Sequence, residues 1–323
     1  MRGFLGPDDV RDLVHDHLGG RLTGLDRLTG GSKKGVYRLT LDDGNTAILY
    51  VWAAGENYWP PAPDVPDDPF TDASGAELFA AAHAALTAAG VRVPHLLMLD
   101  QDGRHLDADV ALVEDAGSVS LESLLGTPAA AAPLAGLAGA LRRMAAGTGP
   151  HYGKVAEVRR GTATQDRPAE DVVVARALAQ LDAAADRDAR LAAARDRVAG
   201  HVRDLRTAVA PRTRYGLVHG ELGPDHVLVT PAGEAVLIDI EGLAWFDVEW
   251  EHAFVRMRLE EAHPELEPAG LDPDRLELYR YAQVLSLIEG PLRIATTDFP
   301  ERDWMLELAE WNITKALAAL QQA

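Results

Sequence analysis

The chain has 323 residues, with 31 lysines and arginines against 50 aspartates and glutamates, no cysteine, and a formal net charge of −19 at pH 7. The lack of a thiol excludes disulfides, thiolate metal sites and cysteine nucleophiles. A chain this acidic is expected to repel nucleic acid and anionic membranes, and it contains no apolar run long enough to predict a membrane span. We therefore expect a soluble cytoplasmic protein, which the length predicts to have two lobes.

The first predicted elements are the two strands of a β-hairpin. Residues 36–41 alternate apolar and polar side chains, residues 46–52 form a buried-strand run, and residues 42–45 between them supply turn chemistry. A glycine-bearing loop, residues 29–35, introduces the hairpin. The proline-rich acidic stretch 53–72 predicts a long loop, and loops of this length are often functional.

One helix and two further strands follow along the chain. Residues 73–89 are rich in alanine, carry apolar residues at helical spacing and stop at Gly90, while residues 96–99 and 110–113 are short strand runs. The sequence then turns from strand-rich to helix-rich. We take the acidic, glycine-bearing segment 114–117 as the boundary between the two lobes.

Helical patterns dominate the rest of the chain. Residues 121–147 and 169–209 predict helical regions, and in the second of these Asp186 and Arg190 are spaced as an i,i+4 pair. Strand-like segments rich in polar residues interrupt the helical pattern once, at residues 215–242. We therefore expect the catalytic residues to lie in this segment.

The polar residues of this segment converge in the predicted structure. Two short apolar runs flank the turn at residues 231–234, so they predict a hairpin that brings His226 close to Asp239. Glu221 lies in the loop five residues before His226. Two carboxylates and an imidazole at one end of a small sheet suit a divalent cation and a general base.

The segment also resembles a known family. Residues 219–226 read HGELGPDH, and Asp239 follows thirteen residues later in Ile-Asp-Ile-Glu-Gly, with Asp247 beyond it. They resemble the H-G-D-x-x-x-x-N loop and the I-D-W motif of the aminoglycoside phosphotransferase-like branch of the protein-kinase fold. The resemblance implies an α+β fold of two lobes: an N-lobe with a small antiparallel sheet (1–113), a hinge (114–117) and a larger, mainly helical C-lobe (118–323).

The resemblance also implies roles for individual residues in phosphoryl transfer. Glu221 would be the catalytic base, Asp239 and His226 would hold metal, His219 would brace the catalytic loop, and Asp247 would support it. The implied nucleotide-binding residues lie on the glycine loop, the strand after it, the following helix and the hinge: Gly30, Gly31, Ser32, Lys33, Lys34, Gly35, Tyr50, Glu77 and Glu114.

Three residues depart from the family pattern. Glu221 replaces aspartate, His226 replaces asparagine, and Tyr50 stands where a lysine is expected to bind phosphate. Lys33 or Lys34 on the glycine loop would supply the missing cation. The alternative is that both lysines are solvent-exposed loop residues.

The function that follows is transfer of phosphate from ATP or GTP, with Mg²⁺ or Mn²⁺, to a hydroxyl of a small molecule. We expect a cationic acceptor such as an aminoglycoside antibiotic, because the chain is acidic and because acids follow the metal motif. These acids are Glu249, Glu251, Glu260 and Glu261. Two alternatives stay open: a kinase-fold module that binds nucleotide without transfer, and a kinase of a metabolite such as a sugar or an amino alcohol. The sequence does not indicate an oligomeric state.

Overall fold

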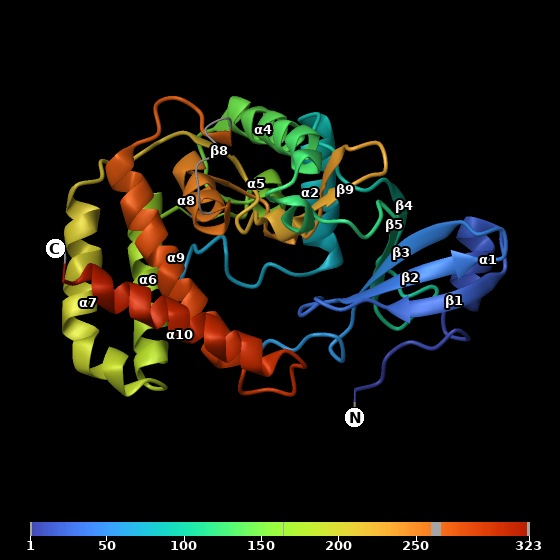
Figure 1. Ribbon diagram of the computed structural model, residues 1–323, viewed down its shortest axis with the longest axis horizontal. Helices are drawn as coiled ribbons and strands as arrows, with labels where there is room; N and C mark the ends of the chain where they lie inside the picture. Colours follow the sequence, from blue (N-terminus) through green and yellow to red (C-terminus); the bar gives the residue numbers. More distant parts are fainter. Residues whose placement is uncertain (1, 164, 260–265, 322–323) are drawn as a thin grey trace. The chain divides into compact units, whose positions relative to one another are not determined.

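The computed structural model describes residues 2–163, 165–259 and 266–321 of the chain. Its contacts group into two compact units, which are described separately below and can be followed in Figure 1. Unit 1 comprises residues 1–59, 74–137 and 225–241, and unit 2 comprises residues 60–73, 138–224 and 242–323. The predicted hinge at residues 114–117 lies inside unit 1. The assignment of these residues as the boundary between two lobes stays a prediction.

Unit 1 is built on a five-stranded antiparallel sheet with strand order β1-β2-β3-β5-β4. The predicted hairpin is present as β2 (Gly35–Leu41) and β3 (Thr46–Trp52). The remaining strands are β1 (Leu22–Arg27), β4 (Leu96–Asp100) and β5 (Asp109–Glu114). The sheet therefore confirms the strands predicted at residues 36–41, 46–52, 96–99 and 110–113. It also contains β1, which was not predicted from the sequence.

A helix covers each face of this sheet. The apolar residues of β3 point alternately to the two faces, so they pack against both helices. Leu49 and Val51 share a core with Leu13 of α1 (Arg11–Leu18). Tyr50, on the opposite face, makes an edge-to-face contact with Phe79 of α2 (Ala76–Ala88). β3 is thus buried on both sides, which explains its unbroken apolar sequence.

The second sheet of unit 1 is the hairpin predicted around the turn at residues 231–234. It consists of β9 (Val227–Val229) and β10 (Ala235–Leu237), which pair antiparallel. Short helices border unit 1: α3 (Leu121–Leu124), η1 (Pro128–Ala130), η2 (Pro224–His226) and η3 (Ile240–Gly242). The hairpin places two predicted site residues at one end, as described below.

Unit 2 is mainly helical. Its helices are α5 (Val155–Arg160), α6 (Ala169–Ala185), α7 (Ala189–Thr207), α8 (Val248–Leu259), α9 (Pro273–Ile294) and α10 (Arg302–Ala319), and α4 (Ala131–Ala146) enters it from unit 1. A four-stranded sheet of order β6-β8-β11-β7 completes the unit: β6 (Thr148–Gly149), β7 (Gly153–Lys154), β8 (Tyr215–Val218) and β11 (Ala244–Phe246). In the described part of the chain, no helix is both long and apolar enough to cross a membrane.

In the region 169–209, the ion pair that Arg190 forms is not the one predicted from the sequence. It forms two helices, and Asp188 caps the second by accepting hydrogen bonds from the backbone amides of Arg190 and Leu191. The predicted pair between Asp186 and Arg190 is wrong: Arg190 pairs with Asp188 at 2.8 Å and with Glu310 at 2.6 Å. The chain breaks its helix at residues 186–188 because an aspartate cap satisfies the first amides of a new one.

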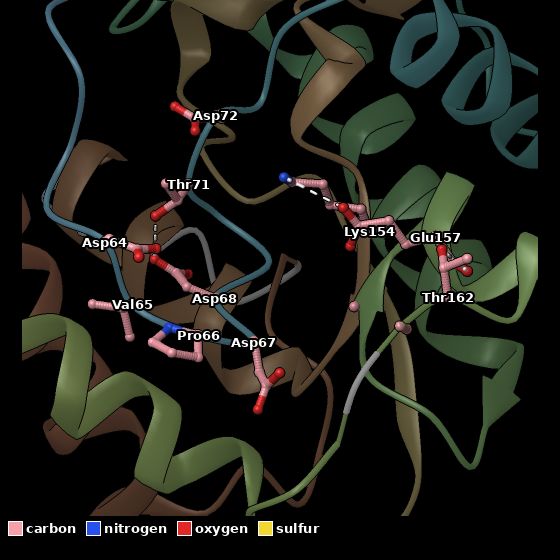
Figure 2. Close-up of a pocket in the computed structure, with 12 residues that line it drawn as sticks. Asp64, Val65, Pro66, Asp67, Asp68, Thr71, Asp72, Lys154, Glu157 and Thr162 are labelled. Atoms are coloured by element: carbon pink, nitrogen blue, oxygen red, sulfur yellow. Dashed lines mark hydrogen bonds and ion pairs between the residues drawn. The ribbon is translucent and has the colours of Figure 1, made fainter.

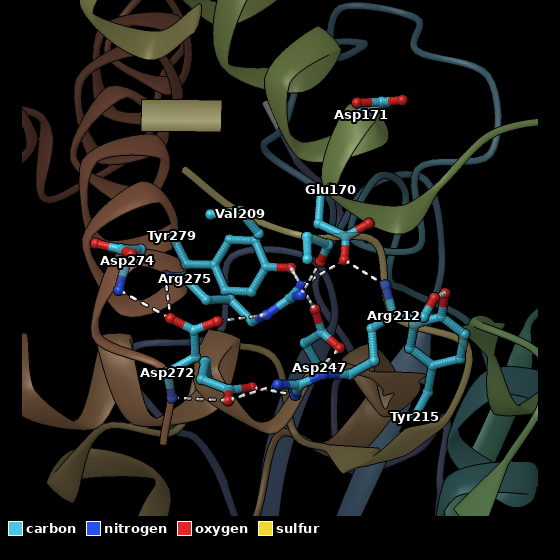
Figure 3. A network of polar contacts seen from close by, with 12 residues as sticks. Glu170, Asp171, Val209, Arg212, Tyr215, Asp247, Asp272, Asp274, Arg275 and Tyr279 are labelled. Carbon is cyan, nitrogen blue, oxygen red and sulfur yellow. Dashed lines mark hydrogen bonds and ion pairs between the residues drawn. The ribbon is translucent and has the colours of Figure 1, made fainter. Parts of the chain in front are cut away.

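A buried polar cluster ties the helices of unit 2 together (Figure 3). The guanidinium of Arg275 donates to the carboxylates of Asp247 and Glu170, and the Tyr279 hydroxyl also donates to Asp247. Burial raises the pKa of Asp247 to about 6, although the neighbouring Arg275 acts in the opposite direction. A carboxylate enclosed in this way holds three segments of the chain together, which agrees with the supporting role expected for Asp247.

Candidate active site

In unit 1, the β9–β10 hairpin brings His226 and Asp239 together. The backbone amide of Ile238 donates to the carbonyl of His226 at 3.0 Å, which extends the pairing by one step beyond the strands. His226 Nε2 consequently lies 3.7 Å from Asp239 Oδ2. Asp239 has a φ of +57°, a left-handed conformation that costs a non-glycine residue free energy and that is concentrated at functional sites.

Lys34 is the cation of this site. Its Nζ lies 2.6 Å from Asp239 Oδ1 and 2.6 Å from Glu241 Oε1, and the residue is only 6% exposed. The expectation of a solvent-exposed lysine is therefore wrong for Lys34. Burial lowers the pKa of Lys34, but the two carboxylates outweigh it and hold the pKa above its ordinary value. Lys33, its neighbour, is partly buried and lies 5.8 Å from the centre of the Trp59 ring.

The glycine loop is shaped by close approaches that exclude side chains. A Cβ on Gly31 would lie 2.7 Å from the carbonyl oxygen of Lys34, and one on Gly35 would lie 2.6 Å from the carboxyl carbon of Glu56. Gly30 has a φ of +94°. Ser32 accepts a hydrogen bond from Trp59 Nε1 at 2.9 Å. A side chain at position 31 or 35 would clash with its neighbours, so glycine at these positions allows the backbone path that places Lys34.

The two predicted acidic nucleotide-binding residues occupy different surroundings. Glu77 is exposed on the first turn of α2. Glu114 ends β5, pairs with Arg92 at 2.5 Å and accepts a hydrogen bond from the His95 backbone amide. Burial raises the pKa of Glu114, but Arg92 outweighs it and keeps the pKa below its ordinary value. The carboxylates that meet Lys34 are instead those of Asp239 and Glu241, and the sequence reading gave Glu241 no role.

In unit 2, the loop that carries Glu221 is held by a buried carboxylate. Glu251, in the first turn of α8, accepts hydrogen bonds from the backbone amides of His219 and Gly220, the latter at 3.2 Å. Trp250 Nε1 donates to the Gly220 carbonyl at 3.2 Å. His219 is buried, whereas Glu221 is exposed. The loop is thus fixed from beneath and presents Glu221 to solvent.

Glu251 also makes the stability of the fold depend on pH. Burial raises its pKa to about 7 in the folded protein, against an ordinary value of 4.5, so folding stability falls as pH rises through this window. We expect wild-type protein to lose about 2 kcal/mol from this group between pH 5 and pH 8. The variant Glu251→Gln lacks this loss, so its stability relative to wild type should rise over the same range in urea unfolding. A difference that stays constant with pH would contradict the assignment.

A pocket of about 300 Å³ lies in unit 2, between the loop at residues 60–73 and residues 153–163 (Figure 2). Five carboxylates and one lysine are among its lining residues: Asp64, Asp67, Asp68, Asp72, Glu157 and Lys154. Asp68 is the anchor of the loop, because its carboxylate pairs with Arg176 of α6 at 2.5 Å. Glu157 pairs with Lys154 at 3.7 Å and Asp67 with Arg167 at 3.9 Å. The negative charge of the lining therefore comes mainly from the exposed Asp64 and Asp72.

The loop that lines this pocket also touches the Glu221 loop. Phe70 stacks on Trp250, with ring centres 4.3 Å apart, and a Cβ on Gly220 would lie 3.4 Å from the Phe70 ring. Thr71 and Asp72, which follow Phe70, line the pocket. One loop therefore both lines the pocket and packs against the loop that carries Glu221. Its composition could not be recognised in the sequence, where the segment appeared only as a proline-rich loop.

The acids expected to attract a cationic acceptor have other partners. Glu249 is buried and pairs with Arg212 at 2.5 Å, and Glu251 is buried under the His219 loop. Glu260 and Glu261 lie outside the described residues. Within the described residues, acidic side chains do line the pocket beside residues 60–73.

The donors near Asp239 fit a divalent metal ion completed by other ligands. Asp239 Oδ2 points toward His226, the Asp239 side chain is 48% exposed, and within the described residues no group of three or more histidines and acids could enclose a metal alone. Mg²⁺ in phosphate-transferring sites is typically held by one or two carboxylates together with phosphate oxygens and water. Asp239 and His226 therefore suit a metal that arrives with a nucleotide.

Comparisons with known proteins identify the family and the fold of the chain. Residues 25–283 match the model of the phosphotransferase enzyme family. No curated protein sequence matches the chain significantly. Among solved structures, a thermostable mutant of the aminoglycoside phosphotransferase APH(4)-Ia is 19% identical, covering 97% of this chain and 99% of its own, with a TM-score of 0.63.

Two other solved structures are similar over almost the whole chain. Spectinomycin phosphotransferase APH(9)-Ia, in complex with ADP and spectinomycin, is 13% identical, covers 98% of both chains and has a TM-score of 0.66. The choline kinase LicA from Streptococcus pneumoniae is 12% identical, covers 98% of this chain and 99% of its own, and has a TM-score of 0.65. These likenesses confirm the α+β, protein-kinase-like fold expected from the sequence.

Proposed function

The chain belongs to the phosphotransferase enzyme family, and from this membership we propose that it transfers the γ-phosphate of ATP or GTP to a hydroxyl of a small molecule. The observation that carries the proposal is the convergence of Lys34, His226 and Asp239 at one end of the β9–β10 hairpin. A cation, an imidazole and a carboxylate suit the binding of a metal-bound polyphosphate. The ADP complex of the spectinomycin phosphotransferase supports a nucleotide donor.

Each proposed site residue has its own role in in-line phosphoryl transfer. Glu221 orients the acceptor hydroxyl and accepts its proton as the oxygen attacks the γ-phosphorus. The bond from that phosphorus to the oxygen bridging it to the β-phosphate breaks, and nucleoside diphosphate leaves. Asp239 and His226 would hold the divalent ion, which when bound would supply charge compensation for the phosphates. Lys34 balances the charge of the phosphate oxygens, and the amides of residues 30–35 bind them. Catalysis of this kind rests on positioning and electrostatics rather than on covalent intermediates.

A transfer assay tests the proposal directly. Purified protein is incubated with ATP or GTP, with Mg²⁺ or Mn²⁺, and with a panel of aminoglycosides, other basic antibiotics, amino alcohols and sugars. Phosphorylated acceptor is detected by mass spectrometry and nucleoside diphosphate by a coupled assay. Product with any acceptor supports the kinase. If the protein binds nucleotide with either metal but phosphorylates nothing in the panel, the non-transferring module becomes the better description.

We further propose that the acceptor carries a positive charge and binds in the pocket beside residues 60–73. The negative lining supports this, since a low-dielectric acidic recess attracts cations. The loop at residues 60–73 both lines the pocket and packs through Phe70 against Gly220 of the Glu221 loop, which supports placing the acceptor near the proposed base. The similar aminoglycoside and spectinomycin phosphotransferases favour an antibiotic, and the similar choline kinase favours a small amino alcohol.

Neutralising two exposed acids of the pocket tests the charge. The double variant Asp64→Asn, Asp72→Asn is expected to raise the KM of a cationic acceptor about fivefold, because each exposed pair contributes up to about 1 kcal/mol. The KM of the nucleotide should not change. The control Asp196→Asn, Asp204→Asn makes the same charge change on the exposed face of α7. Equal effects of the two double variants would show that net charge, and not the pocket, attracts the acceptor.

A further inference from the structure

Tyr50 raises the question of which residue supplies the phosphate-binding cation. In kinases a lysine on the third strand contacts the nucleotide phosphates and forms an ion pair with a glutamate from the following helix. Here β3 carries Tyr50, which is 8% exposed, and the first-turn glutamate of α2, Glu77, is exposed. The chain therefore lacks the lysine at its usual position.

The sheet register shows how Lys34 reaches the same place. Val36 on β2 pairs with Tyr50 on β3, and Gly35 pairs with Val51, so Lys34 enters the sheet directly beside β3. Its Nζ lies 5.2 Å from the centre of the Tyr50 ring. A lysine extending from position 50 would direct its ammonium to the same region.

Glu241 is placed as the partner of this lysine. It is 4% exposed, and its Oε1 lies 2.6 Å from Lys34 Nζ. Burying two opposite charges costs desolvation energy that can equal or exceed their attraction, so this pair is weak evidence for a role in stability. Because Lys34 also contacts Asp239 Oδ1 at 2.6 Å, the same ammonium fixes the orientation of the proposed metal ligand.

We propose that Lys34 and Glu241 form a relocated lysine–glutamate pair that positions the nucleotide phosphates, with Lys34 replacing the missing β3 lysine and Glu241 taking the role expected of Glu77. The inference rests on the proposed function and adds the residues that bind the nucleotide. It also explains Tyr50. A second ammonium that reached this region from position 50 would repel Lys34, whereas the neutral Tyr50 ring, with its centre 5.2 Å from Lys34 Nζ, offers it a favourable face.

The test combines removal of the lysine with its return to β3. The variants are Lys34→Ala, Lys33→Ala, and the double variant Lys34→Ala, Tyr50→Lys, with Lys315→Ala on α10 as the control. Affinity for a fluorescent ATP analogue with Mg²⁺ is measured without acceptor, so that binding is read independently of turnover. Steady-state transfer is measured in parallel.

We expect Lys34→Ala to weaken nucleotide binding at least tenfold and to lower kcat/KM for nucleotide about a hundredfold. Lys33→Ala should have a smaller effect, and Lys315→Ala should stay within twofold of wild type. The double variant should recover most of the lost affinity, because the lysine at position 50 reaches the same carboxylates. Glu241→Gln should weaken binding less than Lys34→Ala, since the lysine remains but loses one of its two anchors.

A folding control separates binding from stability. Lys34→Ala leaves Glu241 buried without its cation, so the variant Lys34→Ala, Glu241→Gln removes both charges of the pair. We expect thermal unfolding close to wild type for this variant, together with nucleotide binding as weak as that of Lys34→Ala. Wild-type affinity in this variant or in Lys34→Ala would overturn the inference while leaving the proposed kinase intact. A wild-type protein that binds no nucleotide with any divalent ion would overturn both.

Discussion

The variant Asp239→Asn is expected to lower kcat by about a thousandfold or more. The substitution removes the charge proposed to hold the divalent ion, and metal compensation of phosphate charge contributes several kcal/mol to such reactions. Asparagine is the appropriate replacement, because it tolerates the left-handed backbone that Asp239 adopts at a φ of +57°. The measurement is the steady-state rate at saturating nucleotide, repeated over a range of Mg²⁺ concentrations.

A neighbouring acid provides the control for Asp239. Asp225 lies on the same side of the hairpin, with Oδ2 3.8 Å from His226 Nε2, and Asp225→Asn should remain within tenfold of wild type. If Asp239→Asn retains a comparable rate, the assignment of the metal ligand is wrong. A common loss in both variants would instead indicate that the total negative charge around His226 holds the ion.

The second large effect is expected at Glu221. Glu221→Gln should lower kcat by about 10²–10⁴, because a positioned base contributes that factor to proton transfer, while the nucleotide KM stays within about threefold. Glu221→Asp keeps an ionisable group with a shorter reach and should retain more activity than Glu221→Gln. The rates are measured as single turnovers with excess enzyme, which isolates the chemical step. Equal rates for wild type and Glu221→Gln would exclude Glu221 as the base.

Local patterns predicted the hairpins well. The alternation in residues 36–41, the apolar run in 46–52 and the turn between them each agree with the structure, since strand pairing across a short turn is decided locally. The same reasoning placed His226 next to Asp239, because a hairpin fixes which residues lie opposite one another. Prediction succeeds here because the residues concerned are close in sequence.

Long-range contacts explain what the sequence reading missed. Lys33 and Lys34 are adjacent on one glycine loop, and their difference arises from contact with Asp239, 205 positions away from Lys34. Glu251 was expected to attract a cationic acceptor, whereas the chain folds it under the amides of His219 and Gly220. No periodicity distinguishes a carboxylate that faces solvent from one that reaches back to a distant loop.

Some missed features did have local signals. Asp188 stands directly before the second helix of the region 169–209 and caps it, which is ordinary behaviour for aspartate at a helix start. Glu241 alternates with Asp239 in Ile-Asp-Ile-Glu, so the two acids could have been assigned to a shared face. Neither signal identifies the group that the side chain contacts, so neither is sufficient to predict the contact.

In the loop at residues 60–73, the residues that anchor the loop are different from those that face the pocket. Asp68 is bound to Arg176, and Phe70 is stacked on Trp250, whereas Asp64 and Asp72 are exposed on the pocket wall. Mutations at Asp64 therefore carry little penalty in folding, while those at the anchors carry a large one. Asp72 has a φ of +50°, so asparagine and glycine are the replacements that its backbone favours. Under selection by a new compound, descendants of this protein can change the charge of the pocket wall at these two positions and keep the rest of the loop in place.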